Sequence, residues 1–285
     1  MFSVDSPDFT LRIVEKVKKT NPNIKTIHFV APQVWVWRKH RVKHIKSFLD
    51  HVLLLFPFEK KYFDKENIQS TFTGHPLIED QEKAKIDISQ IIKDHKKIIS
   101  IFPGSRQSEL NILLPILIDF VKMMNQKHKD IFFVFHSTSE NNKSTQDRLI
   151  KEGFKNCGSI SDENIKSHIL KSSMFAVSKS GTISLEICNS KIPLIIIYKM
   201  NAINFFIVKM LVKVKFASII NIAAEEEVIP ELLQSNCNSK NIFDRVNSLL
   251  EDQKSLKEQV DKSQEIIKKF KTNKSSEIAA SILSN

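Results

Sequence analysis

The chain has 285 residues, of which 41% are apolar and 26% charged, a composition typical of a soluble globular protein with one large or two modest domains. Its net charge of +11 favours phosphates, nucleic acid or an anionic membrane face without choosing among them. Three cysteines without a CxxC pair argue against a disulfide scaffold or a metal site. The sequence shows neither a signal-peptide pattern nor a long uncharged run, which predicts a cytosolic or membrane-peripheral protein.

Short β-type runs alternate with helical patterns, which predicts mainly parallel sheets covered on both faces. In the first part of the chain the expected strands are 1–4, 26–30, 51–56 and 70–73, and the expected helices are 8–19, 36–49 and 59–65. A turn at 74–76 and a polar stretch at 79–95 predict a domain boundary near residue 80. The first half opens at the end of a strand, like a domain that lacks its beginning.

The second part is more complete. Its expected strands are 98–102, 131–136, 174–177 and 193–198, and its expected helices are 108–127, 145–152, 162–171, 183–189, 202–214, 225–234, 239–251, 252–271 and 275–283. We therefore expect a first domain at 1–79 and a second at 80–251. The C-terminal helices at 252–285 are expected to pack back across the domains.

Two loops, 102–110 and 178–186, carry the strongest functional signal. Each follows a strand and opens a helix, where unpaired backbone N–H groups and the helix dipole favour an anion. Two of the five glycines, Gly104 and Gly181, lie in these loops, which suggests a sharp bend or the close approach of a ligand. Two such loops in one α/β unit predict binding of a nucleotide diphosphate.

Arg106 follows Gly104 and Ser105 at the start of the expected helix. Its guanidinium can bind two phosphate oxygens at once, with the Ser105 hydroxyl and loop amides as further donors. The alternative is an ordinary surface ion pair between Arg106 and Glu109.

Ser180, Gly181 and Thr182 can hold phosphates, and Glu186 lies one helical turn farther on. Its carboxylate can accept hydrogen bonds from both hydroxyls of a ribose, as an acidic residue does in dinucleotide-binding folds. The alternative is a helix cap made by Thr182 or Ser184, which is compatible with the first interpretation.

Two features of the first domain have open interpretations. Asp5 and Asp8 flank the turn into the first helix, where a carboxylate could be a general base or merely a helix cap. Trp35 and Trp37, followed by the basic Arg38, could meet a sugar, an acyl chain or a base, or could pack in the core. In the second domain, the Lys-rich apolar segment 204–216 suits a membrane interface or a buried helix equally.

Several linked motifs resemble the lipid-A-disaccharide synthases, which are inverting glycosyltransferases of the two-domain GT-B fold. The motifs are Asp5-Ser-Pro-Asp-Phe9, Pro32-Gln-Val-Trp-Val-Trp-Arg38, Phe56-Pro-Phe-Glu59, Gly74-His-Pro76, Pro103-Gly-Ser-Arg106 with Glu109, Ser180-Gly-Thr182 with Leu185-Glu186, Tyr198-Lys-Met200 and Val228–Gln234. The resemblance implies an α/β fold with two Rossmann-like domains, the N-terminal one incomplete, because the family's first strand and Gly-rich loop have no counterpart.

The resemblance also implies a reaction. The family joins UDP-2,3-diacylglucosamine to 2,3-diacylglucosamine 1-phosphate (lipid X), releases UDP, and works peripherally at the cytoplasmic face of the inner membrane. Asp5 then resembles the general base and Arg106 the arginine on the donor diphosphate. The expected UDP-sugar ligands are Gly104, Ser105, Arg106, Ser180, Gly181, Thr182, Glu186, Tyr198 and Asn221, with Trp35, Trp37 and Arg38 on the acceptor side. No cofactor, metal or nucleic acid is expected, and a homodimer is possible.

One departure lies within the second domain. Around 218–225 the family usually has a proline and a glycine where this chain has Ile220 and Glu225, which puts that turn's role in nucleotide binding in question. Two alternatives to the transferase stay open. One is an enzyme similar to UDP-N-acetylglucosamine 2-epimerase, and the other is an inactive or split-gene remnant that binds only UDP or membrane.

Overall fold

The computed structural model describes residues 1–34, 41–79, 87–92, 97–201, 205, 214–272 and 274–284. The chain divides into two compact units. Unit 1 comprises Met1–Asp80, Phe206–Lys215 and Lys268–Asn285, and unit 2 comprises Gln81–Phe205 and Phe216–Ile267. Each unit contains one parallel sheet, which confirms the predicted α/β class.

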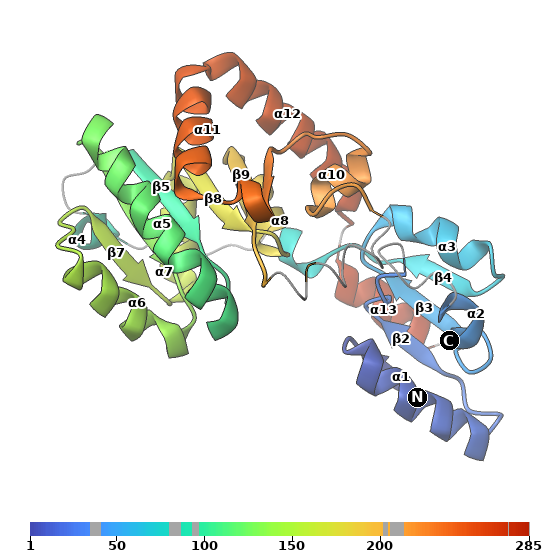
Figure 1. Cartoon of the computed structure of the whole chain (residues 1–285). Helices are drawn as coiled ribbons and strands as arrows, with labels where there is room; N and C mark the ends of the chain where they lie inside the picture. The colour runs from blue at the N-terminus through green and yellow to red at the C-terminus, as the bar shows by residue number, and fades with distance from the viewer. Residues whose placement is uncertain are drawn as a thin grey trace. The chain divides into compact units, whose positions relative to one another are not determined.

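Unit 1 is built on a four-stranded sheet in the order β1-β2-β3-β4 (Figure 1). The strands are β1 (Phe2–Val4), β2 (Ile27–Phe29), β3 (His51–Leu54) and β4 (Gln69–Phe72). The connecting helices are α1 (Pro7–Thr20), α2 (Arg41–Ile45), η1 (Pro57–Glu59), α3 (Lys60–Asp64) and η2 (Pro76–Ile78). Consecutive strands pair in parallel, so each connection brings the chain back to the end of the sheet at which the strands begin.

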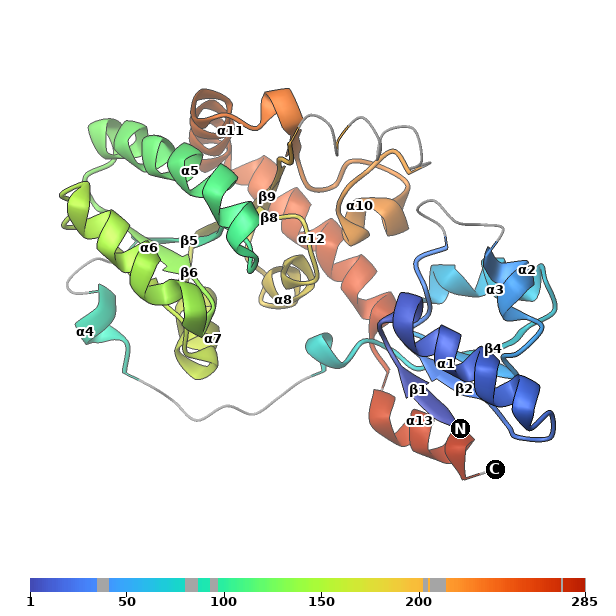
Figure 2. The same cartoon turned by 60° about the horizontal axis from the view of Figure 1, so that its bottom comes forward.

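The last helix of the chain belongs to unit 1. Figure 2 shows α13 (Ser275–Leu283) beside the strands, where Ala279 joins Ile27 in a small apolar cluster. The backbone N–H of Ser275 donates to the carboxylate of Glu79 over 2.8 Å, which ties the start of α13 to the end of the first 80 residues.

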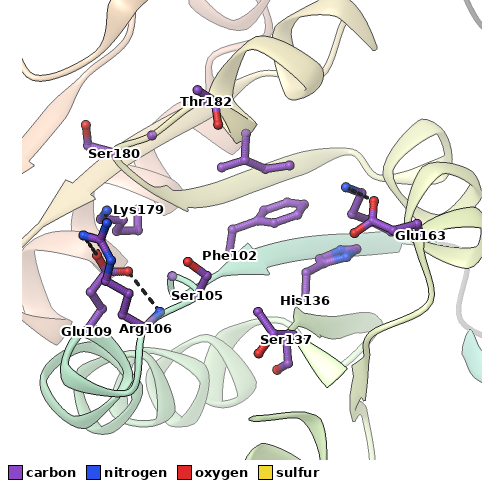
Figure 3. A pocket seen from close by; sticks show the side chains of 15 residues that line it. Phe102, Ser105, Arg106, Glu109, His136, Ser137, Glu163, Lys179, Ser180 and Thr182 are labelled. Atoms are coloured by element: carbon purple, nitrogen blue, oxygen red, sulfur yellow. Dashed lines mark hydrogen bonds and ion pairs between the residues drawn. The ribbon is translucent and has the colours of Figure 1, made fainter. Parts of the chain in front are cut away.

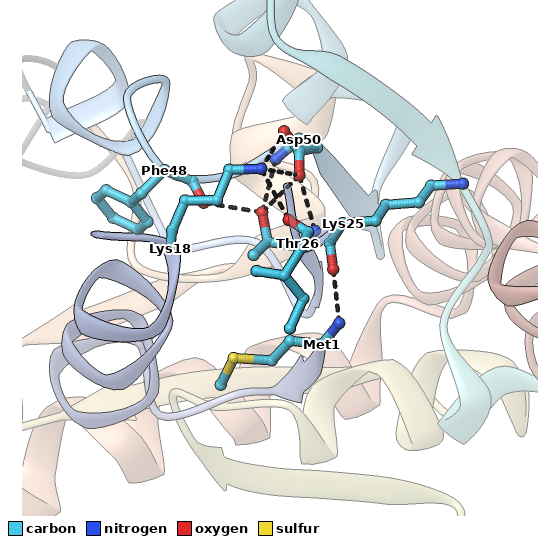
Figure 4. Close-up of polar contacts among 7 residues, drawn as sticks. Met1, Lys18, Lys25, Thr26, Phe48 and Asp50 are labelled. Carbon is cyan, nitrogen blue, oxygen red and sulfur yellow. Dashed lines mark hydrogen bonds and ion pairs between the residues drawn. The ribbon is translucent and has the colours of Figure 1, made fainter. Parts of the chain in front are cut away.

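A polar cluster at the start of β2 and β3 fixes these two strands (Figure 4). Asp50 accepts hydrogen bonds from the backbone N–H of Thr26 at 2.7 Å and from Lys18 Nζ at 2.8 Å. Burial raises the pKa of Asp50, but the hydrogen bonds from Lys18 and Thr26 outweigh it and hold the pKa below its ordinary value. The Thr26 hydroxyl also donates to the carbonyl of Phe48. The cluster is therefore structural and lies outside the predicted site.

Unit 2 is built on a six-stranded parallel sheet in the order β10-β9-β8-β5-β6-β7. Its strands are β5 (Lys97–Phe102), β6 (Ile131–His136), β7 (Cys157–Ile160), β8 (Phe175–Lys179), β9 (Leu194–Tyr198) and β10 (Glu231–Leu233). Its helices are α4 (Ser89–Ile92), α5 (Gln107–Lys127), α6 (Ser139–Lys151), α7 (Glu163–Ser172), α8 (Ile183–Asn189), α10 (Ile219–Ala224), η3 (Gln234–Asn236) and α11 (Ser239–Glu251), and α12 (Gln253–Phe270) runs from this unit into unit 1.

Side-chain alternation along the strands gives the sheet of unit 2 two apolar faces. Ile99 and Ile101 of β5 pack with residues of α5 and α11, whereas Ile98 packs on the opposite face with Ile169 of α7. Strands β6 and β7 are added in sequence on one side of β5, and β8, β9 and β10 are added in sequence on its other side. The direction in which strands are added therefore reverses between β5 and β8. Ligands of open α/β sheets bind at the carboxyl ends of the strands at such a reversal.

The elements differ from the sequence predictions in several places. The predicted helix 225–234 is wrong, because Glu231–Leu233 forms β10 and pairs with β9. Helix α6 begins at Ser139, before the predicted 145, and β7 (Cys157–Ile160) was not predicted. Of the predicted helix 36–49, the described helical part is Arg41–Ile45. Most of the predicted helix 202–214 lies outside the described residues.

Candidate functional site

A cavity of about 340 Å³ lies in unit 2, at the carboxyl ends of β5, β6 and β8 (Figure 3). Both loops singled out in the sequence line it. Gly104, Ser105 and Arg106 come from the loop after β5, and Ser180, Gly181 and Thr182 come from the loop after β8. The cavity therefore lies at the reversal of strand order between β5 and β8.

The loop after β5 requires a glycine. Gly104 has a φ of +109°, which a residue with a side chain rarely adopts, and a Cβ there would overlap the Glu109 carboxylate. The turn leads directly into α5, with Arg106 just before the first helical residue. The backbone thus brings the Arg106 side chain to the rim of the cavity, where it is 81% exposed.

The loop after β8 has a different backbone. Gly181 is outside the left-handed region, and a Cβ there would meet only the carbonyl oxygen of Lys179, at 4.0 Å. The Thr182 side chain makes no capping hydrogen bond, and the Ser184 hydroxyl donates back to the Gly181 carbonyl over 2.7 Å. The predicted cap is therefore not formed. The structure therefore gives Gly181 no left-handed bend that would require a glycine.

An acidic residue organises two cations in the cavity. Glu109 pairs with Lys179 over 2.9 Å and more loosely with Arg106 over 3.8 Å. Burial raises the pKa of Glu109, but the hydrogen bond and charge of Lys179 outweigh it, so the net pKa lies below its ordinary value. Glu109 thus remains ionised and holds Lys179 in place, while Arg106 extends into solvent. The ion pair between Arg106 and Glu109, which the sequence analysis gave as the alternative, is therefore present only as the longer contact of 3.8 Å.

A second ion cluster lies on the α7 side. Lys166, which lines the cavity, pairs with Glu163 and with Glu186 of α8, the latter over 3.1 Å. Burial lowers the pKa of Lys166, but the two carboxylates outweigh it and raise the pKa above its usual value. The predicted ribose ligand Glu186 is therefore linked to the cavity through Lys166 rather than lining it.

Tyr198 is not among the residues that line the cavity, and Ser180, which does line it, has its hydroxyl bonded within the fold. Tyr198 is half-buried, with the ammonium of Lys179 5.5 Å from its ring centre. The Ser180 hydroxyl donates to the carbonyl of Ala217 over 2.7 Å.

Asn221 is fully buried, and its side-chain amide makes four hydrogen bonds within the chain. The Nδ2 group donates to the carbonyl of Ile229 and to the Glu231 carboxylate, and Oδ1 accepts from the N–H groups of Val228 and Ile229. The structure therefore gives Asn221 a structural role and does not bring it to the cavity.

The acceptor-side predictions concern unit 1. Asp5 is exposed at the end of β1, with a φ of +49°, and its carbonyl accepts a hydrogen bond from the Thr10 hydroxyl. Ser6, rather than Asp5 or Asp8, occupies the cap position of α1 and makes no capping side-chain bond. Trp35, Trp37 and Arg38 lie outside the described residues.

The sequence analysis missed several cavity residues, among them Lys166, Lys179 and His136. Lys179 directly precedes Ser180, so its position in the loop was a usable signal. The other two come from a helix and a strand end without any motif. Among the residues that the structure describes, no group of three or more His, Cys, Asp or Glu side chains could hold a metal ion.

Comparison with known proteins gives the same family over nearly the whole chain. The family model described as lipid-A-disaccharide synthetase matches residues 1–283. The lipid-A-disaccharide synthase of Rickettsia prowazekii is 34% identical over 289 residues, covering 99% of this chain and 76% of the relative.

Solved structures are similar at much lower identity. The UDP-N-acetylglucosamine 2-epimerase of Neisseria meningitidis, bound to UDP-GlcNAc, has a TM-score of 0.62 at 15% identity, covering 93% of this chain and 71% of that one. An Escherichia coli trehalose-6-phosphate structure bound with UDP-2-fluoro glucose has a TM-score of 0.57 at 12% identity, covering 99% and 72%. These likenesses concern the fold alone, and they confirm the predicted GT-B fold.

Proposed function

The chain belongs to the lipid-A-disaccharide synthetase family, and from that premise we propose that it transfers 2,3-diacylglucosamine from UDP to lipid X. In this reaction the bond between the anomeric carbon and the UDP oxygen breaks, and the 6-hydroxyl of lipid X forms the new bond. The hydroxyl proton passes to a base, and UDP leaves with its charge.

One observation supports the donor half of this proposal most strongly. The loops after β5 and β8 line a single cavity at the strand reversal of unit 2, and that cavity contains three cations, Arg106, Lys179 and Lys166. A departing diphosphate needs positive charge and hydrogen-bond donors where its own charge develops. Arg106 can bind two of its oxygens, because a guanidinium presents paired donors.

Lys179 is the second cation in this proposal. It is only 20% exposed and is already positioned by Glu109, so little side-chain freedom is lost when a phosphate binds. A diphosphate would accept from Lys179 while Glu109 remains as its second partner. Glu186 would accept the ribose hydroxyls, and that requires its ion pair with Lys166 to loosen or to share the ligand.

The acceptor half rests on the family resemblance. Asp5 would take the proton from the attacking hydroxyl, and its exposed position at the carboxyl end of β1 suits a group that must meet a substrate. Trp35, Trp37 and Arg38 would contact the acceptor or its acyl chains.

The substrates of the proposed reaction are lipids, so we propose that the protein works at the surface of the inner membrane. The net charge of +11 supports attraction to an anionic lipid surface. No helix within the described residues is both long and apolar enough to cross a bilayer.

The test is an assay of the purified full chain with labelled UDP-2,3-diacylglucosamine, with and without lipid X. We expect a labelled disaccharide and free UDP only when both substrates are present. Asp5→Asn should abolish disaccharide formation and leave the UDP affinity unchanged. Arg245→Ala, at an exposed arginine of α11, is the control and should change neither disaccharide formation nor UDP affinity.

Two results would contradict the proposal. Conversion of the labelled sugar without lipid X would favour the epimerase alternative. UDP binding without any disaccharide would favour a remnant that only binds its ligand.

A further inference from the structure

His136 is the buried cavity residue that the proposed reaction leaves without a role. It is the last residue of β6, lines the cavity and is 7% exposed. Its imidazole stacks on the Phe102 ring with 4.1 Å between ring centres and 8° between planes (Figure 3). The ring is therefore held flat against the end of β5, and its two nitrogen atoms have fixed directions.

A chain of three hydrogen bonds determines which nitrogen carries the proton. The hydroxyl of Ser173 lies 2.8 Å from the carbonyl of Ile169, to which it can only donate. A hydroxyl has one proton, so Ser100, 2.8 Å from Ser173, must donate to it. Ser100 has then used its own proton. His136 Nε2, 2.9 Å from the Ser100 hydroxyl, must therefore be the donor of that contact.

The other ring nitrogen is consequently an acceptor. Nδ1 is buried and has no hydrogen-bond partner within the described part of the chain. Burial, together with the nearby charge of Lys166, lowers the pKa of His136 to about 3. The ring therefore stays neutral at physiological pH, and an acceptor of this kind is costly to bury unless a ligand or water supplies a proton.

The diphosphate of a UDP-sugar cannot supply that proton, because both of its phosphates are esterified and fully ionised at neutral pH, so that their oxygens only accept. The donor must come from the part of the ligand that carries O–H or N–H groups. In a UDP-sugar these are the ribose hydroxyls, the imide N–H of the base and the hydroxyls of the sugar.

We propose that His136 Nδ1 accepts a hydrogen bond from an O–H or N–H group of the UDP nucleoside and thereby makes the cavity selective for the nucleoside over a bare diphosphate. This inference rests on the proposed binding of a UDP-sugar. Ser100 and Ser173 are positioning residues, because they act only by fixing the tautomer of His136.

Nitrogen NMR tests the inference directly in the full chain labelled with ¹⁵N-histidine, with His136→Asn identifying the resonances. We expect the Nε2–H tautomer in the free protein and a change at Nδ1 when UDP is added but not when inorganic pyrophosphate is added. An Nδ1–H tautomer would overturn the proposal. So would an unchanged Nδ1 resonance while UDP binds.

Affinities provide the second test. His136→Phe keeps the stacked ring but removes the acceptor, and we expect it to weaken UDP binding about tenfold while pyrophosphate binding stays unchanged. His136→Asn, which restores an acceptor oxygen, should recover part of the loss. Ser100→Ala should give an intermediate loss, because it frees the ring to change tautomer.

Ligand analogues locate the donor. Among 2′-deoxy-UDP, 3′-deoxy-UDP and N3-methyl-UDP, one should bind the unchanged protein about tenfold more weakly and be insensitive to His136→Phe. Analogues that all bind as UDP does, or a variant that loses UDP and pyrophosphate equally, would overturn the proposal. Failure of the unchanged protein to bind either ligand would instead overturn the proposed function and this inference with it.

Discussion

Alanine at Gly104 should destabilise unit 2 by about 3 kcal/mol, whereas alanine at Gly181 should change its stability by less than about 0.5 kcal/mol. A φ of +109° strains any residue with a side chain by on the order of 1–3 kcal/mol. The new Cβ would also displace the Glu109 carboxylate from Lys179, and a charged hydrogen bond contributes roughly 1.5–3 kcal/mol. At Gly181 neither cost arises, because the φ is ordinary and the nearest atom is 4.0 Å away.

Hydrogen exchange followed by mass spectrometry measures this difference within unit 2. Both tryptophans precede residue 80, so their fluorescence would report on unit 1. Peptides from β5, β6 and β8 should exchange about 100-fold faster in Gly104→Ala, which corresponds to roughly 3 kcal/mol. Gly181→Ala should exchange like the unchanged protein yet bind UDP more weakly. Equal exchange in the two variants would refute the backbone argument.

Three further results are expected. Lys179→Met should weaken UDP binding about tenfold in a calorimetric titration, while Lys254→Met, at an exposed lysine of α12, should not. Asn221→Ala should lower the free energy of unfolding by about 3 kcal/mol or more, because it leaves buried backbone groups unpaired, without changing the UDP affinity of the folded protein. The pKa of His136 is about 3 in the folded protein and near 6.5 in the unfolded chain, so the unfolded chain binds the proton first as pH falls. The free energy of unfolding should therefore decrease as pH falls below 6.5. By pH 4.5 that loss should reach about 2 kcal/mol in urea titrations and be absent in His136→Asn.

The parts of the fold and site that the sequence predicted are local in origin. The strands before Gly104 and Gly181 are mostly apolar, and each glycine is followed at once by a residue with a hydroxyl group. Those patterns depend only on neighbouring residues, so the two loops and the helices α5 and α8 could be assigned without a structure. Parallel order followed from the alternation of strands and helices.

The parts that were missed depend on contacts between distant residues. Lys179 meets Glu109 only because β8 lies beside β5, and a lysine in a loop is ordinarily read as solvent-exposed. Likewise, β10 is a strand because Glu231 pairs across to β9, against the local helical pattern of the preceding glutamates. Glu225 has a φ of +59° at the end of α10, so the turn keeps a glycine-like backbone although its glycine is replaced.

The central claim is that the cavity of unit 2 binds the diphosphate of UDP through Arg106. Isothermal titration of the full chain with UDP tests it most directly. The account predicts saturable binding that weakens at least about tenfold in Arg106→Ala, since a charged, paired hydrogen bond is lost, and that is unchanged in Arg245→Ala. Absence of binding heat, or equal affinity in Arg106→Ala and the unchanged protein, would contradict it.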